Sequence, residues 1–238
     1  MTISTVFAQK TTITVRAKAK DAKFIGTSIG GAKILIKNAH NGEILAEGIT
    51  SGSTGDTEKI MQRPHQRNER LSDENTAGFT TELDLSEPIF VTVEAYAPAL
   101  QKQATVKSST QLWLIPGKDI TGEGLVLDIP GFTVDILAPQ THERIASDQQ
   151  IELRANVVMM CGCPTEPDGV WDANDYEVKA LITGQEDFKK EVALSFADKQ
   201  STFAAPVNLE SGLYNLTIYA YDPNTGNTGL DQTAFIVK

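Results

Sequence analysis

Residues 151–163 read IELRANVVMMCGC, and they contain the pattern that decides the fold. Apolar side chains recur at every second position from Ile151 to Val157, with polar side chains between them. A period of two is typical of a β-strand that buries one face. The same alternation recurs along the whole chain, and no window of about 11 residues carries a helical apolar stripe. The sequence therefore predicts an all-β protein.

The predicted strands fall into two sets. The first set comprises residues 11–18, 32–38, 43–49, 78–83, 89–95, 101–107 and 111–115; the second comprises 133–138, 149–159, 176–183, 188–196, 201–207, 213–221 and 233–238. Between the sets, residues 116–131 contain Pro-Gly pairs at both ends and two further glycines, which is turn chemistry. This arrangement predicts two consecutive antiparallel β-sandwiches, over residues 11–115 and 132–238, with a linker at 116–131.

Composition and charge exclude several classes of function. The 238 residues carry 31 acidic and 21 basic side chains, so that the net charge is −10 and the isoelectric point about 4.8. This charge repels phosphate backbones, and we expect no nucleic-acid partner. No apolar run approaches the roughly 20 residues of a membrane-spanning helix, so the chain is not expected to span a membrane.

Residues 1–10, which read MTISTVFAQK, bear on the compartment. The triplet Val6-Phe7-Ala8 is similar to the small-residue end of a signal peptide that has lost its charged and apolar regions. The frayed N-terminus of a cytoplasmic protein fits the same residues. We interpret residues 1–10 as a residual signal or disordered N-terminus, and we expect a periplasmic or extracellular location.

The longest irregular segment is residues 50–77, which is longer than the loops of most sandwiches. It contains the basic run Arg63-Pro64-His65-Gln66-Arg67 within an otherwise acidic chain. A segment of this length is either functional or disordered, and its polar composition favours disorder.

Two family resemblances follow from short motifs. The first half contains four such motifs: Gly31-Ala32-Lys33-Ile34-Leu35-Ile36, Asn41-Gly42-Glu43-Ile44, Gly78-Phe79-Thr80 and residues 89–95 (IFVTVEA). Together they resemble the carboxypeptidase regulatory-like, transthyretin-like sandwich, with residues 50–77 as an insertion. The second half contains three further motifs: residues 134–139 (VDILAP), residues 212–222 (GLYNLTIYAYD) and Gly226-Asn227-Thr228. These motifs resemble those of bacterial Ig-like domains. Tyr214 stands where a tyrosine corner belongs, so we expect its side chain to be buried and its hydroxyl to bond backbone in the preceding turn.

The two cysteines suggest a soft-metal site. Along residues 151–161 the inward face continues from Val157 through Met159 to Cys161, and Cys163 follows two residues later. Thiolates and a thioether suit Cu(I), or Zn(II) if harder ligands join, and Met61 or His65 of the insertion could complete the set. A local disulfide or plain packing accounts for the same residues and is the favoured interpretation.

Acidic and amide side chains in two loops suggest a second, harder site. Asp168, Asp172, Asn174 and Asp175 lie in one loop, and Asp222, Asn224 and Asn227 lie in another. Such oxygen ligands could hold Ca²⁺. Ordinary turn chemistry also explains these residues and is the favoured interpretation, because Asp, Asn and Gly are the residues that turns prefer.

These features support three hypotheses about function. The first is a non-enzymatic secreted or periplasmic module that binds a protein or glycan or contributes to a structural assembly. The second is a copper-type metal-binding protein that uses Cys161, Cys163 and Met159. The third is an enzyme or accessory subunit with a composite site at the domain junction. The residues define neither the partner nor the oligomeric state.

Overall fold

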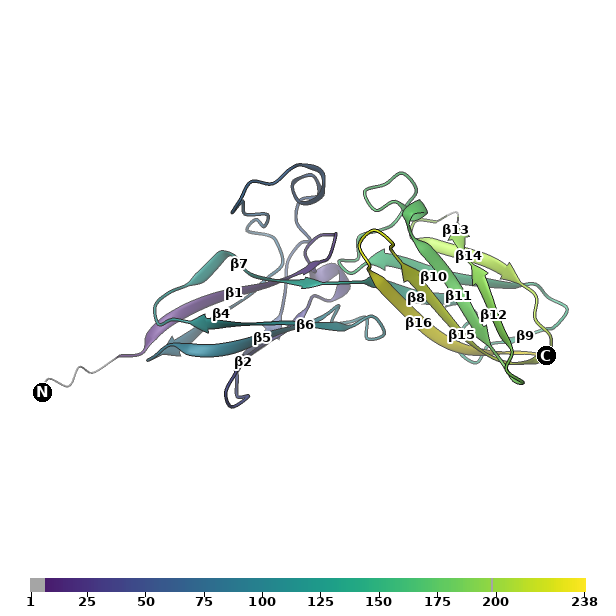
Figure 1. The fold of residues 1–238 in the computed structure, drawn as a ribbon, viewed down its shortest axis with the longest axis horizontal. Coiled ribbons are helices and arrows are strands. Elements are labelled where there is room, and N and C mark those ends of the chain that lie inside the picture. The colour runs from purple at the N-terminus through teal and green to yellow at the C-terminus, as the bar shows by residue number, and fades with distance from the viewer. Residues whose placement is uncertain (1–6, 198) are drawn as a thin grey trace, which may run out of the picture. The chain divides into compact units, whose positions relative to one another are not determined.

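The computed structural model describes residues 7–197 and 199–238, and it is built almost entirely of β-strands, as the sequence predicts (Figure 1). The chain divides into two compact units, Met1–Ile129 and Pro130–Lys238. Each unit contains two β-sheets that pack into a sandwich with its own apolar core.

The first unit contains seven strands in two sheets. The strands are β1 (Gln9–Ala19), β2 (Lys33–Asn38), β3 (Ile44–Ile49), β4 (Phe79–Leu85), β5 (Ile89–Ala97), β6 (Val106–Leu114) and β7 (Ile120–Ile129). One sheet has the order β4-β1-β7 and the other the order β3-β2-β5-β6. Their inward side chains form the core, which includes the fully buried Ile13, Ile34 and Val93. β1 already includes Gln9 and Lys10, so the prediction of an irregular N-terminus over residues 1–10 is wrong at these two; residues 1–6 lie outside the described chain.

The prediction of a linker at residues 116–131 is wrong over most of its length, because β7 runs through it. β7 pairs in parallel with β1, and the register shifts between Ile13 and Val15. At the shift, Gly124 has a φ of +71°, and a Cβ there would lie 2.3 Å from the carbonyl oxygen of Thr14. The glycines thus allow an irregularity within a strand, whereas the same residues in the sequence read as turns.

The predicted strand 101–107 is also wrong over residues 101–105, which form a turn before β6. The Thr105 hydroxyl donates to the carbonyl oxygens of Pro98 (2.7 Å) and Gln101 (3.0 Å). The chain then continues as a single strand where two short ones were predicted.

The insertion at residues 50–77 has defined structure, so the expectation of disorder is wrong. It contains a short π-helical turn, Glu58–Gln62, whose Ile60 is buried. The buried Arg16 of β1 donates hydrogen bonds to the carbonyl oxygens of Thr76 and Ala77. Glu123 of β7 accepts bonds from the backbone N–H (2.9 Å) and the hydroxyl (2.6 Å) of Ser72. The insertion is therefore attached to the sheet β4-β1-β7 by two charged side chains.

The second unit has the strand order of an Ig-like sandwich. Its strands are β8 (Phe132–Ala138), β9 (Arg144–Ile145), β10 (Ile151–Met159), β11 (Glu177–Thr183), β12 (Lys189–Ala193), β13 (Ser195–Phe196), β14 (Thr202–Val207), β15 (Gly212–Tyr221) and β16 (Thr228–Val237). The sheets β13-β14-β10-β8 and β12-β11-β15-β16-β9 correspond to the D-E-B-A and C′-C-F-G orders of Ig domains, with β9 added at one edge. The predicted single strand 188–196 is wrong at the buried Leu194, where the chain passes from one sheet to the other.

Tyr214 forms the predicted tyrosine corner. It lies near the start of β15, the F-like strand, and only 7% of its surface is exposed. Its hydroxyl donates to the carbonyl oxygen of Glu210 at 3.0 Å. Its ring packs against those of Phe188 and Phe235, with centroids 5.5 and 5.7 Å away. Burial and the backbone hydrogen bond are thus both confirmed.

Candidate functional site

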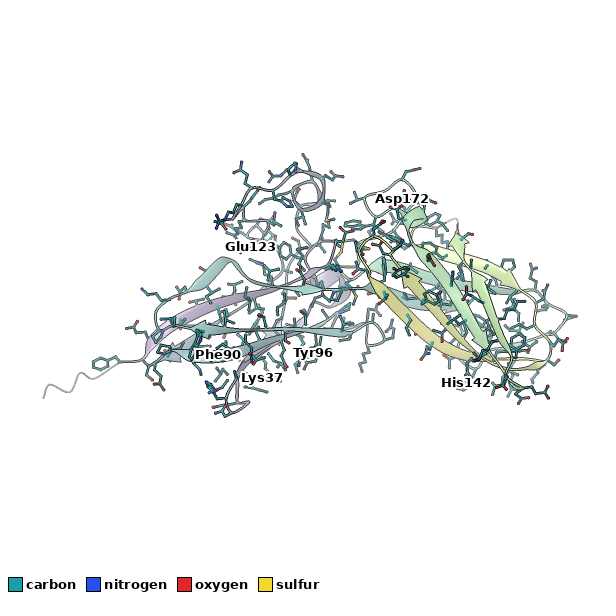
Figure 2. All side chains as sticks on the ribbon, in the orientation of Figure 1. Lys37, Phe90, Tyr96, Glu123, His142 and Asp172 are labelled. Atoms are coloured by element: carbon teal, nitrogen blue, oxygen red, sulfur yellow. A yellow bond between two sulfur atoms is a disulfide. The ribbon has the colours of Figure 1, made fainter. Side chains whose placement is uncertain are left out.

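The outward face of the sheet β3-β2-β5-β6 in the first unit carries the candidate site. Residues 91, 93, 95 and 97 of β5 are buried in the core, so the side chains at 90, 92, 94 and 96 project from the opposite face. Figure 2 shows Phe90, Tyr96 and Lys37 of the neighbouring β2 along this sheet. Large and charged side chains thus share this face.

An aromatic cluster occupies one end of this face. Phe90 of β5 lies directly opposite Trp113 of β6 in the antiparallel register, and their ring centroids are 5.0 Å apart. His40, from the turn between β2 and β3, adds a third ring 6.2 Å from that of Phe90. Trp113 remains 56% exposed. The three rings form a partly open aromatic surface on which a flat ligand could stack.

The aromatic cluster borders a hollow of about 490 Å³ that is rich in hydrogen-bonding groups. Asn38 lines it from the end of β2, Asp84 from the end of β4, and Glu87 from the turn between β4 and β5. Asp84 and Glu87 are exposed, so their oxygens can accept hydrogen bonds from a ligand. The hollow therefore combines an aromatic wall with carboxylate and amide groups, and pockets of this size hold small organic ligands.

A buried carboxylate occupies the middle of the same face. Glu94 is only 6% exposed, and its two oxygens accept bonds from Lys107 (2.5 Å) and Lys37 (2.7 Å). The Tyr96 hydroxyl donates a third bond at 3.0 Å. The Lys107 bond, followed by those of Lys37 and Tyr96, lowers the pKa of Glu94 to about 2. Because all three partners come from β2, β5 and β6, this network joins the strands that present the aromatic cluster.

Cys161 and Cys163 form a local disulfide in the second unit, with Cα atoms 5.3 Å apart. Both cysteines are buried in the turn after β10, where the Met159 N–H donates to the Cys163 carbonyl oxygen at 3.0 Å. Met159 is fully buried, and its sulfur accepts a contact from the Tyr176 hydroxyl at 3.9 Å. With the sulfurs paired, neither cysteine offers a thiolate. A soft-metal site at these residues thus remains a prediction for the reduced protein alone.

Met61 and His65, the proposed co-ligands, lie in the insertion of the first unit. The His65 Nε2 atom is 2.7 Å from the carbonyl oxygen of Lys59. The Nε2 atom of His65 is therefore engaged, and the Nδ1 atom is the ring nitrogen for which no partner is described.

The oxygens of the acidic loops accept hydrogen bonds from backbone N–H groups. Asp172 caps the short 3-10 helix Ala173–Asp175 by accepting the Asn174 N–H at 2.9 Å. In the other loop, Asp222 accepts the Asn224 N–H at 2.8 Å, and the buried Asn227 accepts the Gly131 N–H at 2.9 Å. Among residues 7–197 and 199–238, no three His, Cys, Asp or Glu side chains gather as a metal-binding group. The arrangement matches the turn chemistry that the sequence favoured.

Comparison with known proteins adds little beyond the fold. No protein-family model matches the chain, and no curated protein matches it. Among solved structures, an engineered protein is 18% identical (TM-score 0.34) over 52% of this chain, which spans only 24% of that protein. The fibronectin(III)-like modules of Clostridium thermocellum CbhA are 12% identical (TM-score 0.31) over 94% of this chain and 90% of theirs.

An I-band fragment of titin is 16% identical (TM-score 0.27) over 98% of this chain and 61% of that fragment. The last two are Ig-like or fibronectin(III)-like β-sandwiches, the class to which the strand orders assign the second unit. The assignment rests on those strand orders, because similarity at this level carries no further information. No helix in the described residues is long and apolar enough to cross a membrane.

Proposed function

We propose that this chain is an exported, non-enzymatic binding module that recognises a neutral glycan at the aromatic cluster of Phe90, Trp113 and His40. The observation that carries the proposal is the pairing of the half-buried Phe90 with the exposed Trp113 beside the carboxylates of Asp84 and Glu87. Isolated exposed apolar residues are common on soluble proteins, but three rings around one hollow are a recognition feature.

The chemistry of the hollow matches that of a sugar ring. A pyranose has one face of C–H groups, which stack on the electron-rich face of an aromatic ring, and a rim of hydroxyls, which donate to carboxylates. Trp113 and Phe90 supply the stacking surface, while Asp84, Glu87 and Asn38 supply acceptors. A neutral glycan fits better than an acidic one, because both charged residues that line the hollow are anionic.

Two further observations support export and a non-enzymatic role. Structural disulfides persist mainly in oxidising compartments, and Cys161 and Cys163 are paired. The carboxylates that border the aromatic cluster are exposed, whereas catalytic carboxylates generally act where water is excluded. Membership of the transthyretin-like family for residues 11–115 remains part of this proposal, as does the alternative of a protein partner at the same face.

The test is isothermal titration of the full chain with a panel of neutral oligosaccharides. We expect at least one to bind with a dissociation constant in the micromolar to millimolar range, and Trp113→Ala to weaken it by about tenfold or more. Leu230→Ala is the control, because Leu230 is a similarly exposed apolar residue of the second unit. Binding of tetramethylammonium in place of any sugar would identify a cation site and contradict the proposal.

Metal binding is a second proposal, because Met159 ends β10 and Cys161 and Cys163 follow in the next turn. Mass measurement after alkylation, with and without reductant, should report two protected sulfurs in the native protein. Elemental analysis should find about one equivalent of copper or zinc only after reduction. It should find calcium at Asp172 and Asp175 only if the Asp172 carboxylate releases the Asn174 N–H. An enzymatic role likewise remains a prediction, to be tested by activity screening.

A further inference from the structure

A second hollow, of about 560 Å³, lies on the same sheet face at the end opposite the aromatic cluster. β2 spans the distance between the two ends, about 17 Å for six residues. The surface of the second hollow is mostly apolar and comes from β2, β3, β5 and the turn after β5: Leu35, Ile49, Tyr96, Ala99 and Leu100. Its composition and size are those of a site for the apolar part of a small ligand.

One wall of this hollow is fixed although it is highly exposed. The Leu100 side chain is 75% exposed, yet it rests on Gly30, where a Cβ would lie only 2.3 Å from its Cγ atom. Gly30 also has a φ of +85°, which favours glycine at this position. The Thr105 hydroxyl holds the same turn through its two bonds to backbone carbonyls. The chain's own contacts therefore shape the hollow, although it exposes leucine and isoleucine to water.

The charge of the second hollow is opposite to that of the first. Among the described residues, the charged side chains that line it are Lys33 and Lys102, whereas those beside the aromatic cluster are Asp84 and Glu87. Lys33 also lies 3.6 Å from Glu47, and Lys107 stands 5.8 Å above the Tyr96 ring. Two lysines beside an apolar surface are notable in a chain of net charge −10. Charge complementarity thus selects an anionic ligand.

We infer that this hollow binds a medium-chain alkyl carboxylate that is free in solution and not part of a lipid. This inference does not depend on the glycan proposal. The alkyl chain lies against Leu35, Ile49 and Leu100, where burial removes apolar surface of both partners from water. The carboxylate pairs with Lys102, and Lys33 adds a second positive charge at the rim. The binding is reversible and involves no covalent step.

The test is isothermal titration of the full chain with sodium decanoate below its micelle concentration. Decanoate should bind with one-to-one stoichiometry, while acetate, which lacks the chain, and decyltrimethylammonium, which reverses the charge, should not. Equal binding of decyltrimethylammonium or of acetate overturns the inference. Binding to phosphatidylglycerol vesicles without binding of monomeric decanoate also overturns it, because the site would then recognise a membrane surface.

Two substitutions separate the apolar and the ionic contributions. Leu100→Ala should weaken decanoate by about tenfold and Lys102→Gln by about fivefold. Both residues are exposed, so the variants should remain folded. Leu213→Ala and Lys118→Gln are the matched controls at exposed positions elsewhere, and they should bind as the unaltered protein does. If Leu100→Ala leaves decanoate binding unchanged but abolishes self-association of the protein, the hollow is a contact between copies and the inference is wrong.

Discussion

Removing one hydroxyl group tests the Ig-like assignment of the second unit. Tyr214→Phe keeps the ring, which packs against Phe188 and Phe235, and deletes only the bond to the Glu210 carbonyl oxygen. The substitution therefore isolates the hydrogen bond that defines a tyrosine corner. Tyr219→Phe on the same strand is the control, because no described hydrogen bond involves its hydroxyl.

The expected loss follows from the geometry of this bond. At 3.0 Å between oxygens and with the tyrosine 93% buried, it is an ordinary neutral hydrogen bond, whose net contribution is about 1 kcal/mol. Glu210 is exposed, so water can hydrate its carbonyl oxygen in the variant and keep the loss near this value. For a unit of about 100 residues, such a loss lowers Tm by about 4–8 °C.

Trp171 makes the measurement specific to the second unit. Trp171 is 6% exposed in that unit, and a Trp113→Phe background removes the other tryptophan, which lies in the first. Fluorescence-detected urea unfolding then reports Trp171 alone. A free energy of unfolding for Tyr214→Phe equal to that of Tyr219→Phe would refute the structural role assigned to the hydroxyl.

Three further predictions concern pH and domain structure. Hydrogen bonds from Lys107 and Lys37 lower the pKa of Glu94 from 4.5 to about 2. The ionised carboxylate therefore adds to the free energy of unfolding above pH 4.5, and this contribution is lost as the pH falls through the folded-state pKa near 2. Glu94→Gln should then reduce the free energy of unfolding by about 1–2 kcal/mol at pH 7, because solvent screening roughly halves the energy that corresponds to the full pKa shift. Near pH 2, where the carboxyl is about half protonated, the loss should be much smaller, and equal losses at both pH values contradict this. Burial, and then the charge of Asp231, raise the pKa of Asp135 above 3.8, so this group stabilises the fold below that pH and loses its contribution as pH rises through the folded-state pKa. The calorimetric Tm should therefore fall as the pH rises through the pKa of Asp135, and Asp135→Asn should remove this fall. A variant whose Tm has the same pH profile as the unaltered protein would show that Asp135 does not cause the fall. A fragment of residues 130–238 should unfold cooperatively by circular dichroism, since it holds its own core; a fragment unfolded at 25 °C places the boundary elsewhere.

The sequence predicted those parts of the fold that depend on local alternation. β10 and β15 follow the period of two, and Tyr214 is where the motif placed it. β7 was missed because Gly122 and Gly124, which serve an irregular parallel pairing with β1, are also the residues of turns. Whether these glycines form a turn or a strand irregularity depends on the pairing with β1, which lies more than 100 residues away. The sequence around Gly122 and Gly124 carries no information about that pairing.

The candidate site could not be predicted for a similar reason. Phe90 and Trp113 stand on strands that were correctly expected, but their pairing depends on the register of β5 against β6. Glu87 and His40 come from two further turns, which the fold brings to the same hollow. Outward-facing aromatic residues on two predicted strands were the available signal, and the turn between those strands, which sets their register, was predicted as a strand.

The most direct test of the central claim is the indole N–H spectrum of the unaltered protein. The chain has two tryptophans, so a two-dimensional ¹H–¹⁵N spectrum contains two indole resonances, and Trp113→Phe assigns them. When a neutral oligosaccharide that binds in calorimetry is added, the Trp113 resonance should shift with ligand concentration, while that of the buried Trp171 stays in place. A saturating glycan that leaves the Trp113 resonance unmoved would show that the aromatic cluster is not the recognition site.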